Sequence, residues 1–558
     1  MTPPSSQLDP VTLNIVGRTL DAIAEEMGVN LVRGAFSPLI RETRDISMAV
    51  LSPRGEIVGM AQYVPILLNA MGPAFEGWSA EYPLEALEPG EVIVMNDPFR
   101  GGQHLNDVFL FVPVFVEGIL GGFVANVAHH TDLGGGAPSG NADATEVFQE
   151  GIVIPPMKLD VRERWETTPL VRMMLANVRM PETTLGDLRA QFAASRIAAA
   201  RLGALFAKYG AAVVHCCMDE LLARSERLMR EAIGRLPEGT YRGEASLEDD
   251  GAAGKPLTVR VALTIADGDI VVDFSDTDPQ IRTFSNSTLG STVSTVHTTI
   301  LSVLGGADIP KNGGCFRPVR IVAPLGTAAN PRRPAPSRAR TNICYRIFDA
   351  IVAALMPVAV DRIPSPGFNS QTAISLSRYD GGRWRVFHDI ITGGNGAREC
   401  ADGADGMTLP LTNSLNTPIE AAELEFDFLR IVRYGLRPDS GGAGTFRGGL
   451  GIERVYEVLE DGIRMFGYSD RHLEVPPGFH GGLPGATGRF AVERDGRITR
   501  LSARVNTLLG KGDRLIVWTG GGSGFGLPTA RDGERLERDV RNGLITGELV
   551  QSHRPGAV

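Results

Sequence analysis

Apolar residues recur every three or four positions over the first part of the chain, and alternate with polar residues over much of the rest. The first pattern predicts a helix over residues 10–35, where Asp9 is a candidate N-cap and Pro10 suits the first turn. The same spacing predicts two further long helices, over 181–209 and from about 213 to 235. The N-terminal part should therefore be rich in helix.

Strand patterns occupy other segments. The apolar stretch 108–128 contains Pro113, Glu117 and three glycines, so it is predicted to form two strands rather than a membrane-spanning helix. Further strands are predicted over 48–60, over 240–274 and, between glycine clusters, over 420–530; helices are predicted near 290–304 and 344–357, with one or two short helices over 531–550.

Chain length and the change of pattern predict the domain organisation. A chain of 558 residues is too long for a single core. The third predicted long helix ends at Pro237-Glu238-Gly239, and the residue pattern after it is mainly typical of β-strands. We expect an α+β fold, with a helix-rich domain over 1–237, where helices pack on mixed or antiparallel sheets, and a β-rich domain over 238–558.

Composition excludes several functional classes. The net charge is −10 and there is no basic run, which argues against nucleic-acid binding. The five cysteines show no C-x-x-C spacing, and the start MTPPSSQLDP has no export-signal pattern. We therefore expect a cytoplasmic protein with reduced thiols and no membrane association.

Metal-capable side chains are concentrated in residues 96–132, which hold three of the nine histidines. The candidates there are Asp97, His104, Asp107, His129, His130 and Asp132. If Glu117-Gly118 is a hairpin turn, the two polar ends of 108–128 meet at one end of the hairpin.

A uniform hairpin register places Asp107 opposite Ala128. Strict alternation then puts His104 and His129 on one face and Asp107 on the other, so all three meet only if the chain leaves regular strand before Asp107. A slip of one residue would select His130 in place of His129.

Mixed histidine and carboxylate ligands suit Mn, Zn or Fe(II) better than Ca or Mg. A fourth ligand is available in SPLIRETRDIS, where Glu42 and Asp45 compete. The alternative is that these residues cap turns, as Asp97 before Pro98 is expected to do.

None of the glycine-rich runs matches a phosphate-binding or dinucleotide-binding motif. They are interpreted as tight turns or close backbone crossings. Cys315 and Cys344 are interpreted as small buried residues rather than nucleophiles. The chain itself is therefore not expected to bind ATP.

Several motifs in order resemble the hydantoinase B/oxoprolinase family. They are SPLIRETRDIS, MNDPFRGGQHLNDV, AHHTDLGG, VFQEGIVIPP, GDLRAQ, SGGAGTFRGGLG and TGGGSGFG, and with the flanking helices they span about residues 10 to 543. The family includes B-type subunits of ATP-dependent N-methylhydantoinases and 5-oxoprolinases, and is related to acetone and acetophenone carboxylase subunits.

The resemblance implies a hetero-oligomer in which an A-type subunit binds ATP and phosphorylates a small cyclic amide, while this chain hydrolyses it at a metal. It places the metal ligands on Glu42, His104, Asp107 and His129. Two positions depart from the family pattern. Leu67 stands where relatives often carry histidine, and Cys344 stands in a region that is usually more polar.

The catalytic candidates that accompany these ligands are Asp132, His130 and Asp45, as general base or as groups that orient a ligand. Two other functions stay open from the sequence. One is a subunit of an ATP-dependent ketone carboxylase, and the other is a non-catalytic assembly subunit with a structural metal.

Overall fold

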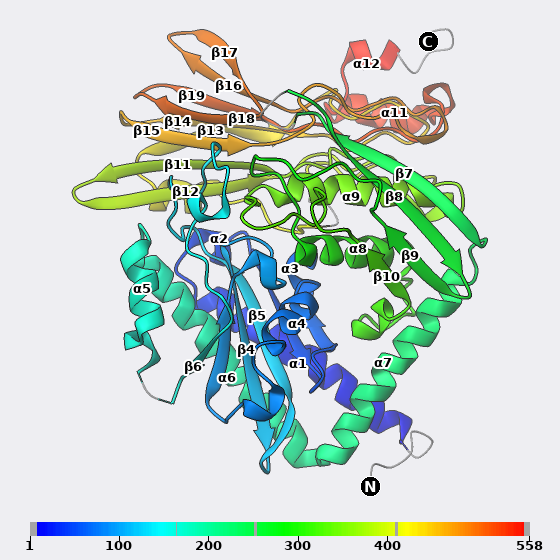
Figure 1. Cartoon of the computed structure of the whole chain (residues 1–558). Coiled ribbons are helices and arrows are strands. Elements are labelled where there is room, and N and C mark those ends of the chain that lie inside the picture. Colours follow the sequence, from blue (N-terminus) through cyan, green and yellow to red (C-terminus); the bar gives the residue numbers. More distant parts are fainter. Residues whose placement is uncertain (1–7, 163, 250–253, 408–410, 552–558) are drawn as a thin grey trace.

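The α+β class expected from the sequence is confirmed in the computed structural model, which describes residues 8–162, 164–249, 254–407 and 411–551 (Figure 1). The helices are α1 (Pro10–Gly34), α2 (Pro38–Arg41), α3 (Pro65–Leu68), α4 (Met71–Ser79), α5 (Pro169–Asn177), α6 (Pro181–Tyr209), α7 (Ala211–Ile233), α8 (Leu289–Leu304), α9 (Arg340–Leu355), α10 (Ile419–Glu425), α11 (Gly533–Arg541) and α12 (Gly547–Gln551). The strands are β1 (Ile46–Leu51), β2 (Ile57–Ala61), β3 (Glu91–Met95), β4 (Asp107–Val116), β5 (Ile119–His129), β6 (Met157–Asp160), β7 (Gly239–Leu247), β8 (Leu257–Ala266), β9 (Asp269–Asp273), β10 (Val319–Val322), β11 (Thr372–Asp380), β12 (Arg383–Ile391), β13 (Leu429–Leu436), β14 (Ile452–Val458), β15 (Ile463–Tyr468), β16 (Arg489–Arg494), β17 (Arg497–Leu501), β18 (Arg504–Leu509) and β19 (Arg514–Trp518).

The long helices begin and end close to their predicted positions because local signals specify them. At the start of α1, Asp9 accepts hydrogen bonds from the N–H groups of Val11 and Thr12, and Pro10 opens the helix. Its buried stripe packs on β1, β2 and α6. The predicted short C-terminal helices are also present, as α11 and α12.

A six-stranded antiparallel sheet, ordered β2-β1-β5-β4-β3-β6, forms the centre of the N-terminal half. Helices α1 and α6 cover one face (Figure 1). Side chains of the other face, including Phe111 and Phe123, join a core that continues into α8 and α9. The sheet is therefore buried on both sides.

The β4–β5 hairpin has the predicted turn. Glu117 and Gly118 both adopt left-handed backbone conformations, with φ of 52° and 80°, which the two-residue turn requires. The register shifts by one residue between Val114 and Phe115. Gly122, opposite Val114, has a φ of 151° and no room for a Cβ beside the carbonyl of Leu51.

This bulge corrects the predicted register. Asp107 lies opposite His129, not opposite Ala128, because the extra residue shifts every pair beyond the bulge. Asp107 and His129 consequently point to the same face of the sheet. His104 lies in the loop before β4, so the predicted departure from regular strand before Asp107 is confirmed.

Three sheets make up most of the C-terminal half. One is ordered β10-β9-β8-β7, and its strands β7 and β8 pack on α9. The others, β12-β11-β15-β18 and β13-β14-β19-β16-β17, share one core that includes Leu376 and Phe387 from the first and Tyr456 and Val517 from the second. Figure 1 shows these two sheets stacked above the N-terminal half.

The glycine runs of the C-terminal half are close backbone crossings. A Cβ on Gly448 would clash with the carbonyl of Gly522, and one on Gly521 with that of Ser440. Runs 440–449 and 520–524 therefore lie against each other, and glycine stands at the points where the two backbones are closest.

Helix α7 ends at Ile233 and β7 begins at Gly239, on either side of the proposed boundary at residue 237. One apolar core nevertheless contains residues from both sides, such as Phe111 and Ile343. The division into two domains stays a prediction. Within the described residues no single helix is long and apolar enough to cross a membrane, although α6 and α7, bent by 109°, would pass that test as a pair.

Candidate metal centre

The end of the β4–β5 hairpin and the loop before it bring three metal-capable side chains together. Asp107 Oδ2 lies 2.7 Å from His104 Nδ1, and Asp107 Oδ1 lies 3.2 Å from His129 Nδ1. All three residues are buried, and each offers one donor atom within 4.8 Å of the others. Such spacing suits a single shared ion.

Unpaired atoms in this group agree with that interpretation. His104 Nδ1 and Asp107 Oδ1 are buried, and their contacts within this group lack hydrogen-bond geometry. His129 Nε2 is also buried and has no hydrogen-bond partner among the described residues. Buried polar atoms are normally paired, so each of these needs an explanation. Two imidazoles and a carboxylate fit a divalent ion such as Mn, Zn or Fe(II).

The charges around the group favour the protonation states of Asp107 and His104 that can bind a cation. Burial alone would raise the pKa of Asp107, but its interactions with His104 and Arg340 hold this pKa well below its usual value. Burial, followed by the charge of Arg340, lowers the pKa of His104 well below its usual value. At neutral pH the site therefore presents an ionised carboxylate and a neutral imidazole, the forms that coordinate metals.

The structure does not bring Glu42 to this group. Its carboxylate lies 2.8 Å from Nε of Arg41, at the end of the short helix α2, and its side chain is 25 % exposed. Arg41 is held there by a second ion pair, to Glu425. The local pairing of Glu42 with its neighbour thus turns it away from the three ligands.

Asp45, the rival of Glu42, is the nearer acid. Its Oδ2 lies 3.6 Å from His129 Nδ1, and its side chain lines the same small cavity as His104 and His129. Burial raises the pKa of Asp45, and the facing His129 opposes that effect. Asp45 therefore stands where it can orient His129 or complete the ligand set.

His130 and Asp132 point elsewhere. His130 Nε2 lies 2.9 Å from Oε1 of Gln191 on α6, on the opposite face of the sheet from His129. Asp132 accepts hydrogen bonds from the backbone N–H and the Nη1 group of Arg179, at 2.8 and 2.9 Å. The structure thus brings His129, and not His130, to Asp107.

The C-terminal half closes the site with residues that the sequence analysis did not select. The cavity measures about 10 Å³ and is lined on this side by Arg338, Arg340, Thr341, Gln371, His388, Thr412, Ser414 and Tyr468. The sequence signal was the polar run SRARTN at the start of α9, which only the fold connects to the histidines. Leu67, the departure noted above, also lines the cavity.

His388 is held by a network that begins at Asp132. His388 Nδ1 lies 2.9 Å from Oγ of Ser139, whose N–H donates to Asp132 Oδ1 at 3.4 Å. Ser139 has a φ of 58°, and Arg338 donates two hydrogen bonds to its carbonyl. Strained backbone of this kind gathers at functional sites. Burial, followed by the charge of Arg338, lowers the pKa of His388 well below its usual value.

Comparison with known proteins places the chain in a class. Residues 9–528 match the hydantoinase B/oxoprolinase family, so the chain belongs to that family. The caprolactamase subunit beta of Pseudomonas jessenii is 31 % identical, over 97 % of this chain and 94 % of the relative.

Solved structures agree with this assignment. The crystal structure of the ATP-dependent caprolactamase from Pseudomonas jessenii has a TM-score of 0.86 and 28 % identity, over 97 % of this chain and 95 % of the other. A nucleotide-free acetone carboxylase also has a TM-score of 0.86, with 19 % identity, over 97 % of this chain and 79 % of the other. At that identity the second likeness shows the fold alone.

Proposed function

We propose that this chain is the hydrolytic subunit of an ATP-dependent enzyme that opens a small cyclic amide, a lactam or a hydantoin. An A-type partner subunit binds ATP and phosphorylates the amide carbonyl. This chain then completes the hydrolysis at a divalent metal held by His104, Asp107 and His129, with Asp45 beside them. The observation that carries the proposal is the buried cluster of these three residues, whose possible ligand atoms all lie within 4.8 Å of one another, in a chain of this family.

The chemistry starts from amide resonance, which makes the carbonyl carbon a poor electrophile. Phosphorylation of the carbonyl oxygen removes that protection. One water then adds to the carbon and the C–N bond breaks, with a proton passing to nitrogen; a second water releases phosphate from the acyl phosphate and leaves a carboxylate. A divalent ion supplies a Lewis acid that lowers the pKa of a coordinated water towards neutrality.

The residues of this chain would hold the ion, exclude bulk water and orient the reactants. Arg340, 2.9 Å from Asp107 Oδ2, stabilises that carboxylate in its ionised form. Arg338 and His388 line the cavity from the other half of the molecule. They are positioned to contact the oxygen atoms of the reacting group.

The first test is metal content. Purified protein should carry about one transition-metal ion per chain. The double variant His104→Ala, His129→Ala should carry none, because it loses both imidazole ligands and keeps only the carboxylate of Asp107. His130→Ala is the matched control, since that imidazole faces Gln191. Elemental analysis decides the outcome, and unchanged metal in the double variant would overturn the site.

A second pair of variants separates Asp45 from Glu42. Asp45→Asn should weaken metal affinity by about 10–100-fold, the usual effect of removing a carboxylate that orients a ligating histidine. Glu42→Gln should leave the affinity unchanged, because Glu42 pairs with Arg41. Competition with a metal-binding dye measures both. A larger loss in Glu42→Gln would restore Glu42 as the fourth ligand.

A further inference from the structure

The cavity beside the candidate ligands has the size of a single water molecule. Its volume is about 10 Å³, which is about the space that one water needs. A water is stable in such a buried cavity only when two or more polar groups of the wall bond to it. The polar atoms of the wall that lack partners inside the protein are therefore the atoms that decide what the cavity can hold.

Two residues of the wall supply such atoms. Oγ1 of Thr341 and Oε1 of Gln371 are both buried, and neither has a hydrogen-bond partner among the described residues. By contrast, the hydroxyls of Thr412 and Ser414, which line the same cavity, are bonded within the protein. Buried polar atoms are normally paired, so the two free oxygens call for a molecule that donates hydrogen bonds to them.

The two oxygens and the candidate ligands come from different parts of the fold. Thr341 lies in the first turn of α9 and Gln371 directly precedes β11, whereas His104 and His129 belong to the N-terminal sheet and its loop. A water molecule donates two hydrogen bonds, and amide and hydroxyl oxygens both accept them. With both protons bonded to these oxygens, the lone pairs of the water are directed away from them, towards the ligand group.

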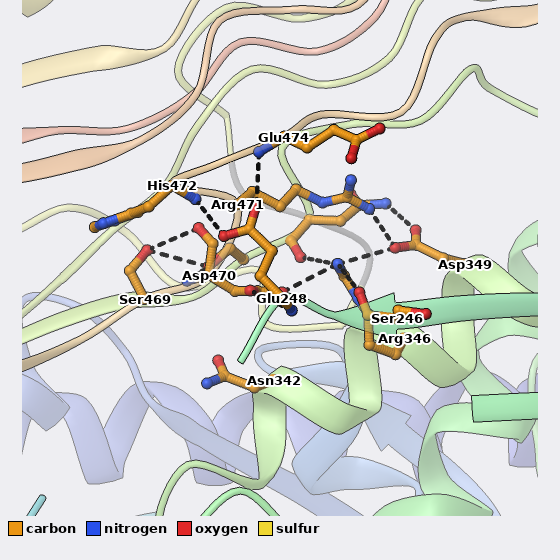
Figure 2. Close-up of polar contacts among 12 residues, drawn as sticks. Ser246, Glu248, Asn342, Arg346, Asp349, Ser469, Asp470, Arg471, His472 and Glu474 are labelled. Atoms are coloured by element: carbon orange, nitrogen blue, oxygen red, sulfur yellow. Dashed lines mark hydrogen bonds and ion pairs between the residues drawn. The ribbon is translucent and has the colours of Figure 1, made fainter. Parts of the chain in front are cut away.

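A buried ion-pair network holds the segment that carries Gln371. Figure 2 shows Arg346 and Arg471 both directed at Asp349, to which they form ion pairs of 2.9 and 2.6 Å. Arg346 also donates to the carbonyl of Asn369 at 2.7 Å, and the amide of Asn369 donates to Asp349. Arg346 and Thr341 both lie on α9, so one helix carries one of the two oxygens and secures the segment that carries the other.

Hydroxyl groups fix the residues on either side of Gln371. Oγ of Ser469 lies 3.2 Å from Oγ of Ser370 and 2.9 Å from Oγ1 of Thr372. The N–H of Asp470 donates to Oγ of Ser370 at 2.8 Å. The backbone before and after Gln371 is therefore held in place, which limits where its amide can point.

We propose that Thr341 and Gln371 orient the water that attacks the substrate. Both hydrogen atoms of this water bond to Oγ1 of Thr341 and Oε1 of Gln371. Its oxygen then bonds to the amide carbon, and a proton passes to nitrogen as the C–N bond breaks. The inference rests on the proposed function, to which it adds two residues and their role.

A crystal structure of the metal-loaded chain tests the water site directly. One ordered water should lie about 2.5–3.0 Å from both oxygens. In the double variant Thr341→Val, Gln371→Met, which removes both acceptors with little change of volume, this water should be absent while the metal remains. No water at this place in the wild type, a water that persists in the double variant, or loss of the metal from the double variant would each overturn the inference.

Kinetics of the complex with the partner subunit test the role. The double variant should lower kcat by about 10- to 100-fold with little change in KM, because the water is present in fewer reactive orientations. Thr341→Ser keeps a hydroxyl and should stay close to wild type. A rise in KM with unchanged kcat would contradict the proposed role.

A control variant removes the same groups outside the cavity. Thr299 is a buried threonine whose hydroxyl bonds within α8, and Oε1 of Gln280 accepts from the N–H of Arg332. Thr299→Val with Gln280→Met should therefore keep kcat, and melting curves should show that both double variants fold. An equal loss of kcat in the control would show that the effect comes from packing and not from the water.

Failure of this inference is distinguishable from failure of the proposed function. If the chain binds metal and supports hydrolysis while the Thr341 and Gln371 variants behave like the control, the assignment of these residues is wrong and the function stands. If the water is found between the two oxygens but the complex opens no cyclic amide, the function is wrong, and with it the catalytic role of this water.

Discussion

Asp107 is the residue on which the candidate metal centre depends most. It contacts His104, His129 and Arg340 at 2.7, 3.2 and 2.9 Å. Arg340 balances its charge inside the protein, and a divalent ion would add positive charge to the same cavity. That surplus favours anionic ligands, such as hydroxide or a phosphoryl oxygen, because buried charges are stable only when paired.

Ser139 gives a prediction at the same scale. Removing its hydroxyl in Ser139→Ala should leave metal content unchanged and lower kcat by about tenfold or more with little change in KM, because His388 loses the group that fixes its ring. The assay is hydrolysis of a cyclic amide by the complex with the partner subunit.

Ser139→Gly separates orientation from backbone strain. Glycine tolerates the φ of 58° but also lacks the hydroxyl. Ser139→Gly should therefore be as slow as Ser139→Ala, and its folded state should be more stable than that of Ser139→Ala. Recovery of activity in Ser139→Gly would show that strain, and not the hydrogen bond to His388, was responsible.

At the scale of elements, the β4–β5 hairpin shows how far sequence reasoning reaches. The turn at Glu117-Gly118 and the two strands were predictable, because turn chemistry and the apolar pattern are local. The bulge at Val114 was not, because it depends on the approach of Gly122 to Leu51 of a neighbouring strand. That one shift decides that Asp107 faces His129.

The same limit applies to Glu42 and to the far wall of the cavity. The pairing of Glu42 with Arg41 depends on Glu425, which lies in α10, and the contribution of His388 depends on the packing of β12. Such contacts join segments hundreds of residues apart. Local spacing predicted a metal-capable cluster within residues 96–132, and the resemblance to the family selected His104, Asp107 and His129 from it. The surroundings of this group required the fold.

A buried carboxyl that joins two elements predicts a pH dependence of stability. Glu150 accepts hydrogen bonds from the backbone N–H groups of Ser337 and Arg338, and burial raises its pKa to about 7, from 4.5. Between pH 5 and 7 the folded chain therefore keeps a proton that the unfolded chain releases. The free energy of unfolding falls as pH rises through this window, by about 3 kcal/mol in all.

Glu150→Gln should remove this contribution. The melting temperature of the variant minus that of wild type should increase steadily between pH 5 and 8. For the exposed control Glu231→Gln this difference should not change with pH. Melting curves at four pH values, read as the difference from wild type, measure the effect. A difference that does not change with pH would contradict the raised pKa of Glu150.

At the scale of the whole molecule, the metal cavity is closed by residues of both halves. His104 and His129 come from the N-terminal sheet, and Arg338 and His388 come from segments after residue 237. Neither half alone contains the site, so the proposed division at residue 237 is not a division of function. Under the proposed function, both halves of the chain would contribute to hydrolysis, and a partner subunit would activate the amide.

That dependence is the last prediction. The isolated chain should not hydrolyse ATP, because its sequence contains no phosphate-cradling loop.

Co-expression with an A-type subunit should give a stable complex, with an interface on the order of 2,000 Å² or more, as permanent hetero-complexes have. Light scattering with and without the partner measures assembly, and ATP turnover by each preparation locates the nucleotide site. If the two proteins never co-elute and this chain opens cyclic amides alone, the relay between subunits is wrong. The metal would then have to activate both water and an unphosphorylated amide, and the protein would be a simple metal-dependent amidohydrolase.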